Sequence, residues 1–112
     1  MDFPKTVRVR SRREYLRFFD GSQVKRLGAC TLFWIPGSQA QARLGITIKA
    51  RVNSVYRNKL KRQIRESFRN HRGSLGSLDF NVVVPGSFRV DHTSPGRVRK
   101  ALEETWKNVG VF

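Results

Sequence analysis

The sequence predicts a single α+β domain in which helices pack on a small sheet of about four strands. The chain has 112 residues, enough for one hydrophobic core and no more. Several short apolar or alternating segments are bounded by Gly and Pro, as strands are. Other segments repeat their apolar residues every three or four positions, as helices do. We therefore treat residues 1–112 as one domain.

Residues 55–69 are predicted to form the central helix, because the segment lacks Gly and Pro and has a clear helical period. Asn53 or Ser54 can cap its first turn. Apolar residues recur at every fourth position along one flank: Tyr56, Leu60, Ile64 and Phe68. The neighbouring flank is polar and basic, and it contains Asn58, Lys61, Arg62 and Arg65.

The part of the chain before this helix contains one short helix and three strands. Residues 1–10 are basic and are expected to be flexible. A helix is predicted over residues 12–19, since Ser11 and Glu14 match a capping box. Strands are predicted over residues 23–27, 29–35 and 43–49. In the second strand one face carries Cys30, Leu32 and Trp34, and the other carries Thr31 and Phe33.

The strand over residues 43–49 alternates between apolar and polar residues, which is typical of a strand with one buried face. Leu44, Ile46 and Ile48 are predicted to be buried. The opposite face is expected to be free for a ligand, with room for close approach at the glycine, and it carries Arg43, Gly45, Thr47 and Lys49.

A buried strand over residues 80–84 and a helix over residues 95–108 complete the prediction. Ser94 is the expected N-cap and Pro95 the first helical residue. The apolar stripe of this helix contains Val98, Leu102, Trp106 and Val109. The order is then α-β-β-β-α-β-α. We expect strands 29–35 and 43–49 to pair, and the central helix to cross over to strand 80–84, parallel to its neighbour.

Charge and cysteine content restrict the function and the compartment. Lys and Arg number 23 against 8 Asp and Glu, which gives a net charge of +15. Such an imbalance indicates a nucleic-acid partner. No segment approaches the roughly 20 apolar residues of a membrane span, so no membrane role is expected. Cys30 is the single cysteine and has no internal disulfide partner, which favours a reducing, cytoplasmic setting.

The basic flank of the central helix is the candidate binding surface. Only Glu66 offers an opposite charge inside the helix, so the cations mostly repel one another and a polyanion would relieve the repulsion. A solvated face of an ordinary amphipathic helix is the alternative explanation. On the first helix, Tyr15 and Phe19 lie four residues apart beside arginines, an arrangement suited to stacking on unpaired bases. Core packing of these rings is the alternative there.

The run Arg-Asn-Lys-Leu-Lys-Arg at residues 57–62, followed by Arg65-Glu66 and Phe68-Arg69, resembles the protein subunit of bacterial ribonuclease P. That family typically shows Arg-Asn-Arg-Ile-Lys-Arg and then Arg-Glu and an aromatic residue. The resemblance extends over about residues 8–108. It implies a ribosomal protein S5 domain 2-like fold with a left-handed βαβ crossover, whereas general rules favour a right-handed one.

The resemblance also implies roles for individual residues. Contacts to the catalytic RNA subunit are expected from Arg57, Asn58, Lys59, Lys61, Arg62 and Arg65. The single-stranded leader of precursor tRNA is expected to lie on Tyr15, Phe19, Trp34, Thr47 and Lys49. The connection after Lys49 is one residue shorter than in the family and lacks its glycine. It therefore stays open whether Lys49 or Arg51 takes a given family role.

The implied activity is removal of the 5′ leader from precursor tRNA by a ribonucleoprotein. Catalysis would take place on Mg²⁺ ions held mainly by the RNA subunit, with no catalytic residue in the protein. A general basic RNA-binding or ribosomal-type protein is the main alternative. A protein-only nuclease would need converging carboxylates or a histidine pair. The carboxylates are scattered over different elements, and His71 and His92 lie in predicted loops.

Overall fold

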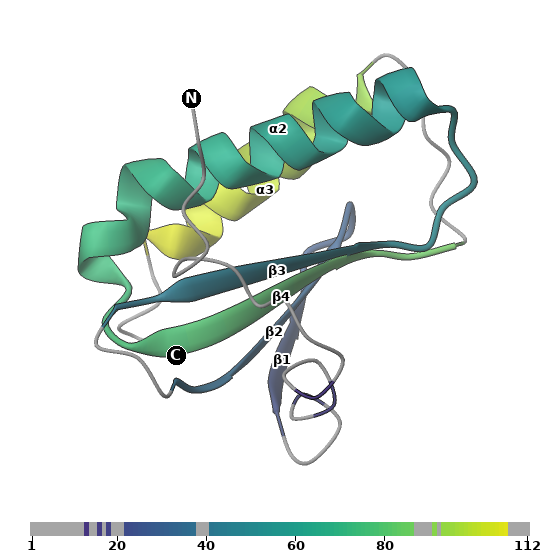
Figure 1. Cartoon of the computed structure of the whole chain (residues 1–112). Coiled ribbons are helices and arrows are strands. Elements are labelled where there is room, and N and C mark those ends of the chain that lie inside the picture. Colours follow the sequence, from purple (N-terminus) through teal and green to yellow (C-terminus); the bar gives the residue numbers. More distant parts are fainter. Residues whose placement is uncertain are drawn as a thin grey trace.

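The computed structural model describes residues 22–37, 41–86 and 93–107, together with Arg13, Leu16, Phe18 and Asp91. In these ranges the predicted order of elements is confirmed (Figure 1). The elements are β1 (Gln23–Arg26), β2 (Thr31–Pro36), β3 (Arg43–Ile48), α2 (Ser54–His71), the 3-10 turn η3 (Arg72–Ser74), β4 (Leu78–Val84) and α3 (Ser94–Trp106).

The predicted helix over residues 12–19 falls mostly outside the described residues. Arg13 and Leu16 are helical and Phe18 is in a 3-10 conformation, in agreement with the prediction at those three positions. Tyr15, Phe19 and the basic segment 1–10 lie outside the described residues.

The four strands form one mixed sheet in the order β1-β2-β4-β3. β4 runs antiparallel to β2 and parallel to β3, so the predicted parallel neighbour of β4 is confirmed. The predicted pairing of β2 with β3 is wrong, because β4 lies between them. β4 has the sequence Leu-Asp-Phe-Asn-Val-Val-Val, and five of its seven residues are buried. A strand this apolar loses more water-exposed surface in the middle of a sheet than at its edge.

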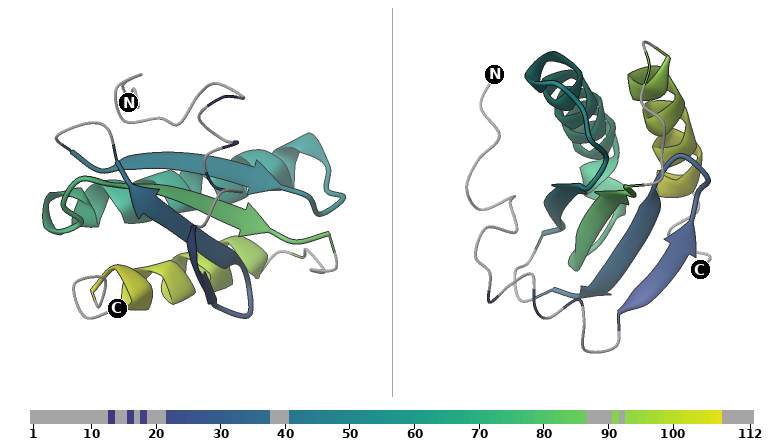
Figure 2. Two further views of the ribbon diagram at one scale, coloured as in Figure 1. Left: turned by 90° about the horizontal axis from the view of Figure 1, so that it is seen from below. Right: turned by 90° about the vertical axis from the view of Figure 1, so that its right-hand side faces the viewer.

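Both long helices lie side by side on one face of the sheet (Figures 1 and 2). In the right-hand view of Figure 2, α2 lies above β3 and β4, and α3 lies above the β2 side. The path from β3 through α2 to β4 turns left-handed when it is followed through these views, as the resemblance implies. The opposite face of the sheet, which we call the open face, is not covered by α2 or α3.

The main hydrophobic core fills the space between the helices and the sheet. Leu60, Ile64 and Phe68 of α2 are fully buried there, as the apolar stripe predicted. The rings of Phe68, Phe80 and Trp106 pack edge to face, with centroids 5.1–6.2 Å apart. The stripe of α2 becomes buried only after its first turn, since Tyr56 is half-exposed.

A smaller apolar cluster lies on the opposite face of the sheet. Phe18 and Ile35 are buried in it, and Phe33 packs against them. Phe18 falls within the first predicted helix, so at this position the prediction can be placed on the structure: the Phe18 side chain packs against β2.

The helix starts follow local side-chain chemistry. The side chain of Asn53 accepts a hydrogen bond from the Tyr56 amide at 3.0 Å, so the predicted capping of α2 is confirmed. α3 begins one residue earlier than predicted, with Thr93 rather than Ser94 at the N-cap position. The Ser94 hydroxyl instead accepts a hydrogen bond from the Asp91 amide at 2.8 Å, which holds the turn before the helix.

Candidate RNA interface

The basic residues of α2 gather on the side of the helix away from α3. Side chains three or four positions apart lie on one side of a helix. Gln63, Glu66 and Ser67 contact α3, so they mark the side that faces it. The other side forms what we call the basic flank, and it consists of Arg57, Asn58, Lys61, Arg62, Arg65 and Arg69.

The side chains of the basic flank are accessible to a ligand. Asn58, Arg62 and Arg69 are exposed, and the remaining three are half-exposed. Lys59 is also exposed but lies off the flank, with its Nζ 5.8 Å from the centroid of the Tyr56 ring. α2 carries six Lys and Arg residues against one carboxylate, that of Glu66. The helix therefore presents a strong positive charge that is balanced only weakly by its own residues.

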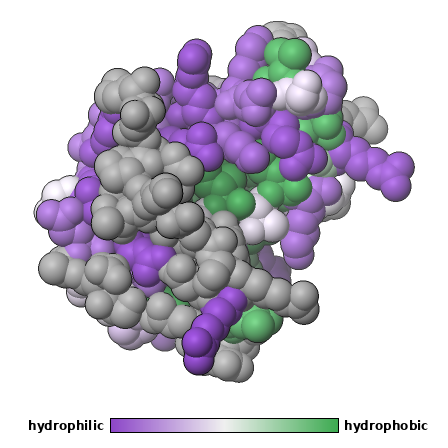
Figure 3. All heavy atoms as spheres, in the orientation of Figure 1, coloured by the Kyte–Doolittle hydropathy of each residue, from purple (hydrophilic) through white to green (hydrophobic). Residues whose placement is uncertain are grey.

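The basic flank lies beside the β3 edge of the described sheet. β3 is the last strand in the sheet order, and Figure 2 shows α2 above it. The Nε of Arg72, just past α2, donates to the carbonyl oxygen of Ala42 at 3.1 Å and ties the helix end to the start of β3. Figure 3 shows hydrophilic side chains gathered along the upper part of the molecule, where α2 lies in Figure 1.

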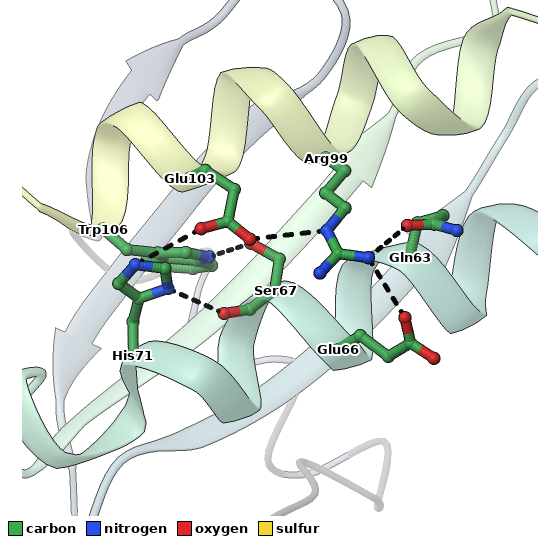
Figure 4. A network of polar contacts seen from close by, with 7 residues as sticks. All are labelled: Gln63, Glu66, Ser67, His71, Arg99, Glu103 and Trp106. Atoms are coloured by element: carbon green, nitrogen blue, oxygen red, sulfur yellow. Dashed lines mark hydrogen bonds and ion pairs between the residues drawn. The ribbon is translucent and has the colours of Figure 1, made fainter.

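A polar network joins α2 to α3 on the side opposite the basic flank (Figure 4). Arg99 is at its centre, and its Nη1 donates to Gln63 Oε1 at 2.8 Å and to Glu66 Oε2 at 3.1 Å. Its Nε donates to Glu103 Oε1 at 3.4 Å. The other oxygen of Glu103 lies 3.3 Å from Nε2 of His71. The sequence interpretation placed His71 in a loop, whereas it is the last residue of α2.

Two of the polar side chains predicted to be accessible on the polar face of strand 43–49 are accessible, and one is buried. Thr47 is half-exposed on it and donates from Oγ1 to Asn81 Oδ1 at 3.3 Å, and Lys49 is exposed just past β3. The prediction that Arg43 is free for a ligand is wrong. Its side chain is 8% exposed and lies 3.9 Å from the carboxylate of Asp79, which is itself buried. A buried cation needs such a partner, and the partner comes from β4.

Trp34 and Thr47 lie on opposite faces of the sheet, so the side chains predicted to hold the leader do not all share one face. Trp34 packs against the main core under the helices. Phe33, its neighbour, points to the open face and packs with Phe18 and Ile35. The alternation in the sequence separates these two faces of β2 as the structure does, and Phe33 is the aromatic side chain that β2 places on the open face.

The leader-binding candidates Tyr15 and Phe19 lie outside the described residues. Phe18, which is described, lies on the open face beside β2. Within the described ranges, no three His, Cys, Asp or Glu side chains come together where they could hold a metal ion. Nor does any helix in those ranges have the length and apolarity needed to cross a membrane.

A small α+β domain with a cationic helix flank beside a sheet edge is typical of proteins that bind RNA. The sequence comparisons define the family. A family model described as Ribonuclease P matches residues 3–110. The ribonuclease P protein component of Acinetobacter baylyi is 36% identical over 110 residues, which cover 96% of this chain and 82% of that protein.

Solved structures agree with this assignment. The RNase P protein from Thermotoga maritima aligns with a TM-score of 0.67 and 28% identity, covering 87% of this chain and 96% of that one. The RNase P protein from Staphylococcus aureus aligns with a TM-score of 0.74 over 100% of this chain and 96% of that one, and at 24% identity it supports the fold. The chain belongs to the ribonuclease P protein family, whose members are components of an RNA-containing endoribonuclease that processes tRNA.

Proposed function

We propose that this chain binds the catalytic RNA subunit of ribonuclease P through the basic flank and binds the leader of precursor tRNA on the open face of the sheet. The observation that carries the proposal is the charge of α2, which contains six Lys and Arg residues and one carboxylate. That carboxylate is directed to α3, so the flank itself presents cations and an amide. Phosphate oxygens are the natural partners of such a surface.

The RNA-subunit contacts would come from the exposed and half-exposed residues of α2. Arg57, Lys61 and Arg65 form one row at four-residue spacing, with Asn58 and Arg62 beside it. Guanidinium groups can bind phosphates with two parallel hydrogen bonds, and the Asn58 amide can donate to or accept from a base edge. Lys59 would add charge at the margin of this surface.

The leader would lie across the open face, between the first helix and β3. Thr47 and Lys49 are accessible there, and Phe33 lies on that face in place of Trp34. Tyr15 and Phe19 would supply the stacking rings, a proposal that rests on the sequence and the family resemblance. Base stacking on aromatic rings tolerates different sequences, which suits a leader that varies between tRNAs.

The phosphodiester hydrolysis would take place on Mg²⁺ held mainly by the RNA subunit in the cytoplasm. The role of the protein would be to screen the repulsion between two polyanions, which raises the affinity for substrate and for Mg²⁺. The residues described here would act by binding, and none is assigned a catalytic role.

Reconstituted cleavage tests this proposal. A precursor tRNA is incubated at low Mg²⁺ with a bacterial ribonuclease P RNA, with the protein, and with both. We expect the protein to stimulate cleavage by the RNA and to cleave nothing alone. Binding of both RNAs without any change in rate would favour a general RNA-binding or ribosomal-type protein instead. Cleavage by the protein alone would place the chemistry in the protein and contradict the proposal.

A further inference from the structure

A contact between Arg99 of α3 and Glu66 of α2 sets the direction of the Glu66 side chain. Glu66 is the one carboxylate of α2, and its Oε2 accepts a hydrogen bond from Nη1 of Arg99 at 3.1 Å. The same Nη1 donates to Gln63, three residues earlier on α2. Figure 4 shows both acceptors turned toward α3. The carboxylate is therefore held on the side of α2 that lies away from the flank.

Without Arg99, Glu66 has cationic neighbours on its own helix. Arg62 lies four residues before it and Arg69 three residues after it, and these are the spacings at which helical ion pairs form. Arg62 is exposed and makes no ion pair within the described part of the chain. A carboxylate that turned to Arg62 would occupy the guanidinium that the flank offers to phosphate.

The position of Arg99 is itself fixed from the α3 side. Its Nε donates to Glu103 Oε1 at 3.4 Å, one helical turn further along α3. The second oxygen of Glu103 lies 3.3 Å from His71, at the end of α2. The guanidinium of Arg99 thus bridges Glu66 of α2 and Glu103 of α3, and these contacts hold the planar group in one orientation.

We infer that Arg99 is a positioning residue for RNA binding, which acts by keeping Glu66 off the basic flank. The inference rests on the proposed function of that flank. The ion pair contributes little to folding, because the side chains of Arg99 and Glu66 are 34% and 39% exposed. Its loss would therefore affect the affinity for RNA more than the melting temperature.

The test measures the affinity of the full-length protein for a bacterial ribonuclease P RNA at several salt concentrations. Four variants are compared with the unsubstituted chain: Arg99→Gln, the double variant Arg99→Gln with Glu66→Gln, Lys100→Gln and Arg62→Ala. Lys100→Gln is the matched control, since it removes one exposed charge from α3 without touching Glu66. The double variant has the same net charge as the unsubstituted chain. Thermal melts show that each variant is folded at the assay temperature.

We expect Arg99→Gln to bind about two- to fivefold more weakly than Lys100→Gln does, the range for an ion pair of this exposure. The double variant should return to within about twofold of the unsubstituted chain, because no carboxylate remains to compete for Arg62. Equal affinities for Arg99→Gln and Lys100→Gln, or no recovery in the double variant, would overturn the inference. Arg62→Ala separates the two levels of the argument. If Arg62→Ala also leaves RNA binding unchanged, the proposed role of the basic flank is wrong. If Arg62→Ala weakens RNA binding while Arg99→Gln behaves like Lys100→Gln, only the role of Arg99 is wrong.

Discussion

Gly37 is a residue that no side chain can replace without movement of the backbone. A Cβ atom there would lie 2.0 Å from the carbonyl oxygen of Ser77 and 2.9 Å from Oδ1 of Asp79. We expect Gly37→Ala to lower the free energy of unfolding by about 2–3 kcal/mol, measured by urea denaturation. Gly96→Ala is the control, because nothing lies within 4 Å of its added methyl group and it sits in α3. It should be neutral or stabilise by up to about 1 kcal/mol. Similar losses in both variants would contradict the explanation.

The buried thiol of Cys30 makes the free energy of unfolding fall as the pH rises into the alkaline range. Burial raises the pKa of its thiol from 9.0 to about 12. Below pH 9 both the folded and the unfolded thiol keep their proton. Between pH 9 and 12 the unfolded chain loses the proton while the folded chain retains it, so stability falls as pH rises. The linkage amounts to about 1 kcal/mol at pH 10.

The measurement for Cys30 is urea denaturation at pH 8 and pH 10 for the unsubstituted chain and for Cys30→Ala. Other groups titrate in both proteins, so the comparison isolates the thiol. We expect the substituted protein to lose about 1 kcal/mol less between the two pH values. Equal losses would mean that the thiol reaches solvent in the folded state.

At the level of elements, the start of α2 depends on one side chain. Asn53 satisfies the amide of Tyr56, one of the four backbone donors that a helix start leaves without partners. We expect Asn53→Ala to lower the free energy of unfolding by about 1 kcal/mol. Ser54→Ala is the matched control, since Ser54 is exposed and its side chain makes no hydrogen bond within the described ranges. A loss of the same size in the control would show that Asn53 acts through something other than capping.

The basic flank of α2 makes a prediction about salt. If Arg62 neutralises a phosphate, its loss should weaken binding to the RNA subunit and lower the slope of log affinity against log salt by about 1. Titration of Arg62→Ala with a bacterial ribonuclease P RNA at several salt concentrations measures both. An unchanged slope would show that Arg62 does not contact phosphate.

The elements themselves could be predicted from sequence because their signals are local. The helical period of α2 placed the basic flank, and the Asn53 cap follows from residue type. The pairing of strands could not be predicted in the same way. Adjacent strands usually pair, whereas here β4 lies between β2 and β3 although α2 separates it from both along the chain. No short-range pattern shows that Arg43 is buried against Asp79 or that Arg99 holds Glu66, since these partners are distant in sequence.

The whole molecule presents two separate surfaces, and this separation can be tested. α2, which carries the basic flank, lies on the other side of the sheet from the open face (Figure 2). We expect the double variant Tyr15→Ala with Phe19→Ala to weaken binding of precursor tRNA to the assembled enzyme more than it weakens assembly with the RNA subunit. Arg62→Ala should do the reverse. Binding assays for each step measure both, and equal loss at both steps would rule out the proposed division of labour.

The central place of β4 in the sheet also determines when the chain can fold as it is made. The β1–β2 hairpin is local and has its partners early. β3 has to wait for β4, because β4 is its partner in the described sheet. The apolar stripe of α2 stays uncovered until β4 and then α3 have left the ribosome. Most of the domain therefore folds late in synthesis, in one step that brings β4 and α3 together with the earlier β2, β3 and α2.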